Sequence, residues 1–357
     1  MSLVCFGDRG SHLVDTLMLR EAGEAPAVCA EQIIRNRELV REAGAYLRRL
    51  DPPFVATLAR GSSDQAAMFA KVLLETRARI PTLSHSPSIG SIYRSTSAKL
   101  RGVPLIAISQ SGRSPDLLAA AEDAKAQGAI LVAIVNDEAS PLAHLADITI
   151  PVHAGVETSV AATKSFVATL VALAHLVSEW SGDDRLRAAV DAIGSSLSGA
   201  WECDWTGIVP LLRNTESLLV LGRGLTLPIA GEAALKFKET SGLHAEAYSS
   251  AEVAHGPMTL VRSGDPVFVF GPRDEARRGL AELLAGFAAR GATVIGTGHP
   301  DDFAEGAIPL VDAPSIDPAI AAIGAIQSFY RLANALALAR GRDPDSPPFL
   351  SKVTKTL

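Results

Sequence analysis

Short apolar runs alternate along the chain with longer segments in which apolar residues recur at helical spacing. A short apolar run bounded by turn residues predicts a buried strand, and a three- to four-residue period predicts a helix. In the first half, strands are expected at 54–59, 80–84, 104–108, 130–135 and 147–151. Helices are expected at 65–76, 115–127 and 163–180, and over 16–50 with an interruption around Pro26. Strands alternating with helices predict an α/β fold on a parallel sheet.

The second half repeats this order. Gly61 and Gly224 each follow an apolar run and precede a helix, and they are 163 residues apart. Gly128 and Gly291 have the same separation. A constant offset between landmarks indicates a duplicated domain. The expected divisions are a helical segment, two α/β domains and a tail, at 1–50, 51–195, 200–340 and 341–357.

The segment 104–116, P-L-I-A-I-S-Q-S-G-R-S-P-D, joins a strand to a helix through a hydroxyl-rich turn. Pro115 suits the first helical position, where its missing N–H would be unpaired anyway. Free N–H groups and the helix dipole favour an anion there, and serine hydroxyls donate to phosphate oxygens. A helix cap with solvated serines is the alternative, but this cluster of serines with a Gln and a Gly favours phosphate. No Gly-Lys-Ser/Thr follows, so this is not a nucleotide P-loop.

A second polar turn, Arg60–Asp64, follows the strand at 54–59. Ligands of parallel sheets lie beyond the carboxyl ends of the strands. Ser63 and the serine loop at 109–114 are therefore expected to face one pocket. In the second copy Gly271-Pro-Arg-Asp replaces the serine loop, so we expect one phosphate pocket per chain.

Three charged residues, Glu232, Lys236 and Glu239, lie at i, i+4 and i+7 of an expected helix and so share one face. A solvated row of salt bridges is the simpler interpretation. Their neighbours are mostly apolar, however, and a carboxylate in such surroundings can have a raised pKa and carry protons. His255, in a loop before Gly-Pro, and Lys352, near the C-terminus, have the pattern of ordinary surface groups.

Composition narrows the classes of function. The net charge is −6 and no Lys/Arg run is present, so no nucleic-acid partner is expected. Cys5, Cys29 and Cys203 form no C-x-x-C pair, which argues against a disulfide framework or a zinc site and fits a reducing cytoplasm. The longest apolar run, 166–177, is too short to span a bilayer and predicts a buried helix, and no secretory signal is visible.

Six motifs in order resemble the sugar isomerase (SIS) domain family, and most of all the isomerase half of glucosamine-6-phosphate synthase. They are S-Q-S-G-R-S (109–114), E-T-S-V-A-A-T-K-S-F (157–166), L-G-R-G (221–224), E-A-A-L-K-F-K-E (232–239), H-A-E-A-Y (244–248) and H-G-P (255–257). The resemblance extends from about Met18 to the tail. It implies two tandem SIS domains, each a five-stranded parallel sheet between helices, in a homodimer.

The resemblance also implies which residues bind the substrate, a small sugar phosphate. The groups that would hold the phosphate are Ser63, Ser109, Gln110, Ser111 and Ser114. Val160 would contact the sugar through its backbone. Glu232 and Lys236 would be polar groups near the sugar.

Three residues receive chemical roles from the same resemblance. Glu239 would move a proton between C1 and C2 of the sugar. His255 would open the sugar ring in the neighbouring subunit's site. Lys352 would form a Schiff base with the open-chain ketose, which requires a lowered amine pKa. No metal or organic cofactor is implied.

Some features depart from the synthase pattern. Ser114 replaces a threonine, Ala162 replaces a serine, and Pro348-Phe349 replaces Arg-Asn before the tail motif. We also expect no glutaminase segment with its cysteine nucleophile. The sequence therefore predicts a cytoplasmic enzyme that converts glucosamine 6-phosphate to fructose 6-phosphate and ammonia. The alternatives are ammonia-dependent synthesis, the substrates galactosamine 6-phosphate or a fructosamine 6-phosphate, and a non-catalytic sugar-phosphate sensor.

Overall fold

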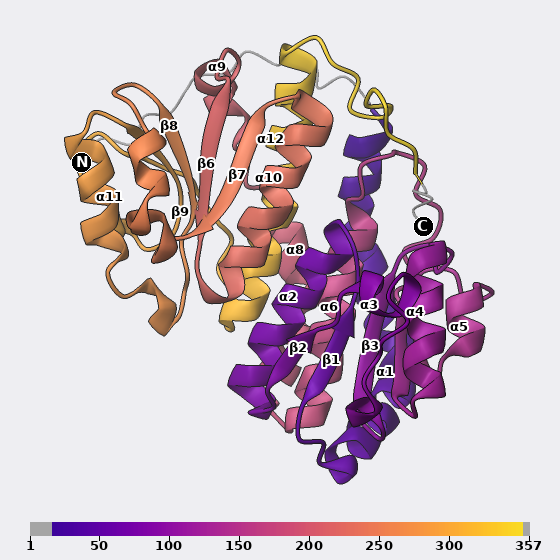
Figure 1. Cartoon of the computed structure of the whole chain (residues 1–357). Helices are drawn as coiled ribbons and strands as arrows, with labels where there is room; N and C mark the ends of the chain where they lie inside the picture. Colours follow the sequence, from indigo (N-terminus) through magenta and orange to yellow (C-terminus); the bar gives the residue numbers. More distant parts are fainter. Residues whose placement is uncertain (1–15, 353–357) are drawn as a thin grey trace.

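The computed structural model describes residues 16–352, and within them the chain forms two parallel sheets with flanking helices (Figure 1). The first sheet has the strand order β2-β1-β3-β4-β5. Its strands are β1 (Val55–Leu58), β2 (Thr82–Ser84), β3 (Pro104–Ser109), β4 (Ile130–Val135) and β5 (Ile148–Pro151). All five strands expected from the first half are present, and every neighbouring pair is parallel.

The second sheet has the order β10-β9-β8-β6-β7, also with parallel neighbours. Its strands are β6 (Ser217–Gly222), β7 (His244–Ser249), β8 (Pro266–Phe270), β9 (Thr293–Thr297) and β10 (Ile308–Pro309). Counted from its own first strand, each sheet has the order 2-1-3-4-5. The predicted duplication and the predicted pair of five-stranded parallel sheets are thus confirmed.

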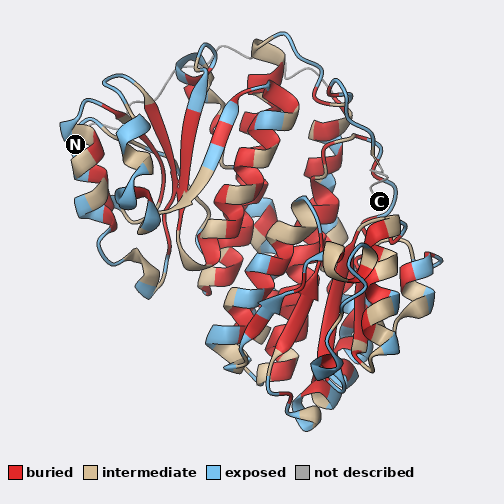
Figure 2. Cartoon of the chain, in the orientation of Figure 1, coloured by how far each residue is buried: buried red, intermediate tan, exposed pale blue. Residues whose placement is uncertain are grey.

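The helices of the first half are α1 (Leu17–Leu50), α2 (Ser62–Leu73), α3 (Pro87–Ser91), α4 (Pro115–Ala126), α5 (Pro141–Leu145), α6 (Lys164–Ser181), α7 (Asp184–Asp191) and α8 (Ile193–Trp201). Those of the second half are α9 (Val209–Leu212), α10 (Leu227–Ser241), α11 (Leu280–Ala289) and α12 (Pro318–Ala339). In Figure 1 a helical layer that includes α2, α6, α10 and α12 separates the two sheets. The largest cluster of buried apolar residues runs through this layer into both sheets, and Figure 2 shows its helices largely buried.

Helix α1 is continuous through Pro26, so the predicted interruption was wrong. A proline inside a helix leaves the carbonyl four residues earlier without its usual N–H partner. Here that carbonyl belongs to Ala22, and the side-chain Nε2 of Gln327 on α12 donates to it at 2.8 Å. A donor from a distant helix therefore replaces the missing backbone bond.

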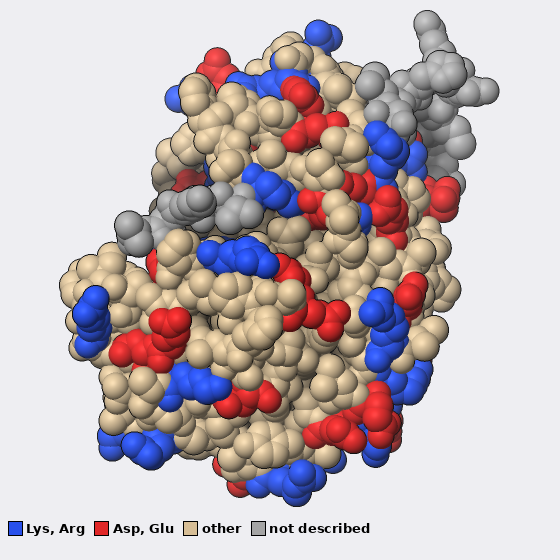
Figure 3. All heavy atoms as spheres, turned by 90° about the vertical axis from the view of Figure 1, so that its right-hand side faces the viewer, with Lys and Arg blue, Asp and Glu red and all other residues tan. Residues whose placement is uncertain are grey.

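The run at 166–177 lies inside α6 and is buried throughout, as predicted. No helix among residues 16–352 has the length and apolar character needed to cross a membrane. Cys29 and Cys203 are free thiols, whereas Cys5 and the tail residues 353–357 lie outside the described residues. On the face shown in Figure 3, basic and acidic side chains are intermixed.

Candidate functional site

The site lies at the point in the first sheet where the order of the strands reverses. β1 and β3 are neighbours, but the chain continues from them to opposite sides, and such a switch point opens a crevice at the carboxyl ends of the strands. The loops that follow β1 and β3 line one cavity of about 360 Å³ there, together with α10 and the C-terminal tail. Its lining is Arg60, Gly61, Ser62, Ser63, Ile108, Ser109, Gln110, Ser111, Ser114, Leu117, Val160, Ala162, Lys236, Glu239, Leu350, Ser351 and Lys352.

The serine loop is held by its own backbone. Ser109 Oγ accepts a hydrogen bond from the N–H of Gly112 at 3.1 Å, and Gly112 has a positive φ of 60°. A Cβ at Gly112 would lie 2.2 Å from Ser140 Oγ, so only glycine fits this turn. Ser114 is the N-cap residue of α4, but its side chain makes no capping hydrogen bond. The Ser114 hydroxyl therefore does not form the helix cap that was the alternative interpretation of this loop.

An ion pair links the two loops that line the cavity. Arg60 Nε lies 2.5 Å from Asp116 Oδ2, and the Asp116 side chain is buried at the start of α4. The guanidinium compensates the charge of a carboxylate that would otherwise oppose an anion at this helix end. Sequence reasoning assigned no role to either residue, because their pairing depends on β1 and β3 being neighbours.

Lys236 sits at the centre of a buried charge cluster on α10. Its Nζ contacts the carboxylate of Glu239 and lies 3.4 Å from both Glu232 Oε1 and Ser62 Oγ. The side chains of Glu232 and Lys236 are 0% and 1% exposed, and that of Glu239 is 23% exposed. The solvated salt-bridge row, the simpler interpretation of this spacing, is therefore wrong for Glu232 and Lys236. Ser62 Oγ also donates to Glu232 Oε1 at 3.1 Å and so joins α2 to α10.

Burial and neighbouring charge set the protonation of this cluster. Burial, offset in part by Lys236, raises the pKa of Glu232 from 4.5 to about 7. Burial lowers the pKa of Lys236, but the two carboxylates beside it raise that pKa above its usual value. Lys236 is therefore an ammonium ion at neutral pH, and Glu232 keeps its proton to a higher pH than an exposed glutamate does. The buried hydroxyl of Tyr330 on α12 also has a raised pKa, through burial and the nearby carboxylates.

The tail brings Lys352 into the lining of the same cavity. Its Nζ donates to Glu157 Oε2 at 2.8 Å and to the carbonyl of Ser159 at 2.7 Å. Although burial raises the pKa of Glu157, the charge and hydrogen bonds of Lys352 and Ser165 bring it below its usual value. Glu157 lies in the motif at 157–166, but the sequence predicted no role for it. Its only signal was a lone carboxylate in a segment of small polar residues.

The remaining expected residues differ in position. Val160 lines the cavity, and its backbone N–H donates to the carbonyl of Asp345 at 3.1 Å. Glu232 lies directly behind the lining, in contact with Lys236. His255 is exposed in a short 3-10 helix, Glu252–His255, and does not line this cavity. The fold thus brings every expected residue except His255 into the lining of this cavity or directly behind it.

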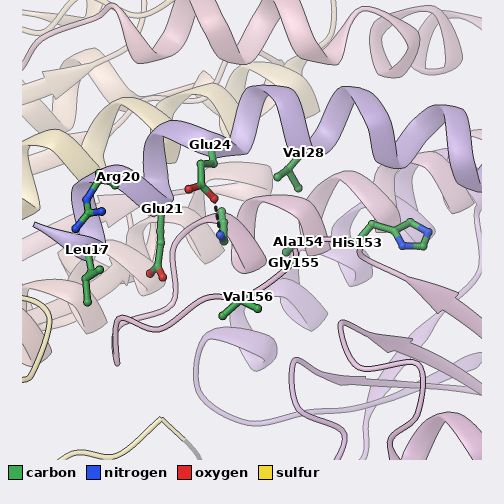
Figure 4. A pocket seen from close by; sticks show the side chains of 10 residues that line it. Leu17, Arg20, Glu21, Glu24, Val28, His153, Ala154, Gly155 and Val156 are labelled. Atoms are coloured by element: carbon green, nitrogen blue, oxygen red, sulfur yellow. Dashed lines mark hydrogen bonds and ion pairs between the residues drawn. The ribbon is translucent and has the colours of Figure 1, made fainter.

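A second cavity of about 360 Å³ lies beside the first turns of α1 and the segment after β5 (Figure 4). Its lining includes Glu21, Glu24, His153 and Lys164. Lys164 Nζ is 2.5 Å from Glu24 Oε2, and Glu21 accepts two backbone N–H groups. Its charges are thus satisfied within the chain. Among the described residues, no three His, Cys, Asp or Glu side chains are grouped to hold a metal ion.

Two α/β domains of one topology, with a polar cavity at the strand ends of the first, place this chain among tandem α/β ligand-binding proteins. The chain belongs to the SIS domain family, whose model matches residues 54–178 and 211–304. The glutamine–fructose-6-phosphate aminotransferase of Thermococcus kodakarensis is 31% identical over 94% of this chain. The chain spans 57% of the length of that relative.

Solved structures give the same family relationship. A Silicibacter pomeroyi protein provisionally assigned as a phosphosugar isomerase is 42% identical, with a TM-score of 0.87 over 93% of this chain and 100% of that chain. The C-terminal domain of the glucosamine-fructose-6-phosphate aminotransferase from Francisella tularensis is 28% identical, with a TM-score of 0.80 over 93% of this chain and 98% of that domain. The predicted family is confirmed.

Proposed function

We propose that this chain is a phosphosugar isomerase and deaminase that converts glucosamine 6-phosphate and water to fructose 6-phosphate and ammonia. One observation carries the proposal: a single cavity is lined by a hydroxyl-rich helix N-terminus, a partly exposed glutamate paired with a buried lysine, and a second lysine amine. The kinship with the isomerase part of sugar-phosphate aminotransferases supports the class of substrate.

In this proposal the phosphate lies at the serine loop. Ser109, Gln110, Ser111 and Ser114 all line the cavity at the start of α4, and Ser63 lines it from the start of α2. Helix N-termini and hydroxyl groups bind phosphate without a cluster of cations. Binding energy from this remote end of the substrate would orient C1 and C2 toward α10.

At the other end of the substrate, Glu239 takes the proton from C2 of the open-chain aldehyde and returns it to C1. The ammonium of Lys236, which contacts Glu239, would stabilise the negative charge that develops on the substrate oxygen. The product of this transfer is an imine at C2. The amine of Lys352 would add to C2 and displace ammonia, and water would then hydrolyse the lysine imine to the ketone.

Ring opening would come from a second copy of the chain. We infer a homodimer in which His255 reaches into the partner's cavity, because it is exposed and absent from the lining of its own. We place the reaction in the cytoplasm, in keeping with the free thiols of Cys29 and Cys203.

The reverse reaction is the second candidate, because the related aminotransferases act on fructose 6-phosphate by name. The same proton transfers would then add ammonia to fructose 6-phosphate. Galactosamine 6-phosphate and a fructosamine 6-phosphate remain alternative substrates, and a non-catalytic sensor remains the alternative of another class.

The deciding experiment measures ammonia release from glucosamine 6-phosphate, galactosamine 6-phosphate and a fructosamine 6-phosphate in parallel. Release from the first, with fructose 6-phosphate formed in equal amount, supports the deaminase. Glucosamine 6-phosphate formed from fructose 6-phosphate and ammonium chloride alone would support the synthetic direction. No turnover with any of them, while sugar phosphate still binds, would contradict both and favour the sensor.

A further inference from the structure

The carboxylate of Glu157 is a junction of three segments that meet at the cavity. Its Oε1 accepts the backbone N–H groups of Thr163 at 3.0 Å and Ser165 at 3.1 Å, at the start of α6. Its Oε2 accepts from Ser165 Oγ at 2.6 Å. Both oxygens thus contact the start of α6, and Glu157 is buried there directly behind residues that line the cavity.

The same Oε2 also accepts from two residues that line the cavity. Gln110 Nε2 of the serine loop lies 3.2 Å from it, and Lys352 Nζ of the tail lies 2.8 Å from it. The side chain of Glu157 is 0% exposed, whereas that of Lys352 is 23% exposed. A buried acceptor whose oxygens are all hydrogen-bonded is held in place, so it restrains where Gln110 and Lys352 lie relative to each other.

We propose that Glu157 is a positioning residue that holds the Lys352 amine at a set distance from the phosphate-binding serine loop, through the oxygen it shares with Gln110. Within residues 16–352, the other acceptor of this amine is the carbonyl of Ser159. The use of that amine to form an imine with the sugar rests on the proposed function, but its placement by Glu157 does not.

Glu157→Gln is the direct test, because an amide has one acceptor oxygen where the carboxylate has two. If that oxygen keeps the two backbone N–H groups of α6, the NH2 group faces Lys352 and Gln110 and cannot accept from either, and the negative charge beside the ammonium is lost. Ser165→Ala is the matched control: it removes a hydroxyl from the same Oε2 and leaves the Lys352 and Gln110 contacts in place. Both variants disturb the start of α6, so a loss of thermal stability in both would not distinguish the roles. The chemical reactivity of Lys352 does distinguish them.

The first measurement is the rate of reductive methylation of Lys352 by formaldehyde and dimethylamine-borane, followed by peptide mass spectrometry, with the exposed Lys99 as internal reference. In the unaltered chain Lys352 is expected to react roughly tenfold more slowly than Lys99, since a charge-assisted hydrogen bond holds it. Equal rates would overturn the proposal without any variant. Glu157→Gln should remove most of that protection and Ser165→Ala should not; protection retained in Glu157→Gln would also overturn it.

The second measurement is borohydride trapping of fructose 6-phosphate on Lys352 at saturating sugar. Misplacing a reacting group by an ångström can cost roughly a hundredfold in rate, so Glu157→Gln should trap at least about tenfold more slowly although its amine is freer. Trapping as fast as in Ser165→Ala would overturn positioning. If the unaltered chain protects Lys352 but forms no trapped product, the imine chemistry of the proposed function fails while the positioning by Glu157 stands.

Discussion

At the residue scale, burial decides what the charges of α10 can do. Glu239 keeps 23% of its side chain exposed at the cavity, whereas Glu232, one turn from Lys236, has none. The carboxylate at the cavity can meet a substrate, and the one behind it can only influence its neighbours. Two glutamates on one helix face thus support different predictions.

Glu239→Gln is expected to lower turnover of glucosamine 6-phosphate by roughly 10²- to 10⁴-fold, the usual contribution of a positioned acid–base group. Binding of fructose 6-phosphate should survive, because the serine loop is unchanged. Solvent deuterium incorporation at C1 measures the proton transfer, and calorimetry measures the binding of fructose 6-phosphate. Glu246→Gln, on the exposed face of β7, is the control; exchange at the unaltered rate in Glu239→Gln would remove Glu239 from the mechanism.

Glu232 should make the stability of the protein depend on pH. Its pKa is raised by burial from 4.5 to about 7, so the folded state keeps a proton that the unfolded state releases. The stabilisation is complete below about pH 4.5 and is lost as the pH rises through 7. Relative to Glu232→Gln, whose side chain is always neutral, the wild type should lose on the order of 3 kcal/mol of unfolding free energy across this window. Urea unfolding of both proteins from pH 4.5 to 8 measures this difference, and parallel curves would contradict it.

At the element scale, small residues bring helices close enough to carry the site. Gly44 of α1 faces the backbone of α6, and a Cβ there would lie 2.7 Å from Glu179 Cβ and 2.9 Å from Trp180 N. The N-terminal end of the same α6 is held by Glu157. α6 is thus held at one end by Glu157 and packed closely against α1 at the other.

Gly44→Ala is expected to destabilise the protein by about 1–3 kcal/mol, because the added methyl group meets backbone that cannot move aside alone. Gly286→Ala in α11 is the matched control, since a Cβ there meets nothing within 4 Å. Alanine's better helix propensity should leave that variant neutral or up to about 1 kcal/mol more stable. Thermal unfolding of the pair checks the opposite signs, and equal shifts would contradict the packing argument.

At the scale of the whole molecule, the cavity joins parts that are far apart in sequence. The serine loop comes from the first domain, Lys236 and Glu239 come from the second, and Lys352 comes from the tail. Asp345 anchors the tail by accepting the N–H groups of Leu17 and Met18 at 2.8 and 2.7 Å. Neither domain contains the cavity by itself.

Mixed dimers test whether His255 completes the partner's site. His255→Ala and Lys352→Ala should each be inactive, and random exchange of their subunits should restore up to about a quarter of wild-type activity, since half the dimers carry one intact site. Glu239→Gln mixed with Lys352→Ala is the control, because both residues line the cavity of one chain. That mixture should restore nothing. A His255→Ala mixture that stays inactive would contradict the shared site.

Much of the fold and part of the site were determined by the sequence alone. Apolar runs bounded by turn residues located the strands, because a strand buried on both faces needs a continuous apolar segment. The offset between Gly128 and Gly291 revealed the duplication, since each copy repeats the same turns. The serine loop was visible because strand, hydroxyl turn and helix N-terminus are consecutive in the chain.

Only the tertiary structure decided what depends on contacts between distant segments. Pro26 stays inside α1 because Gln327, some 300 residues later, donates to the carbonyl that Pro26 leaves free. Lys236 is buried because α10 packs against α2 and α12, which no helical spacing can show. Glu157 became a candidate only when the tail placed Lys352 beside it. The local sequence pattern shows which ionisable groups are present. Their burial and their ion pairs arise from packing between elements, and burial and pairing set the charge and the position of each group.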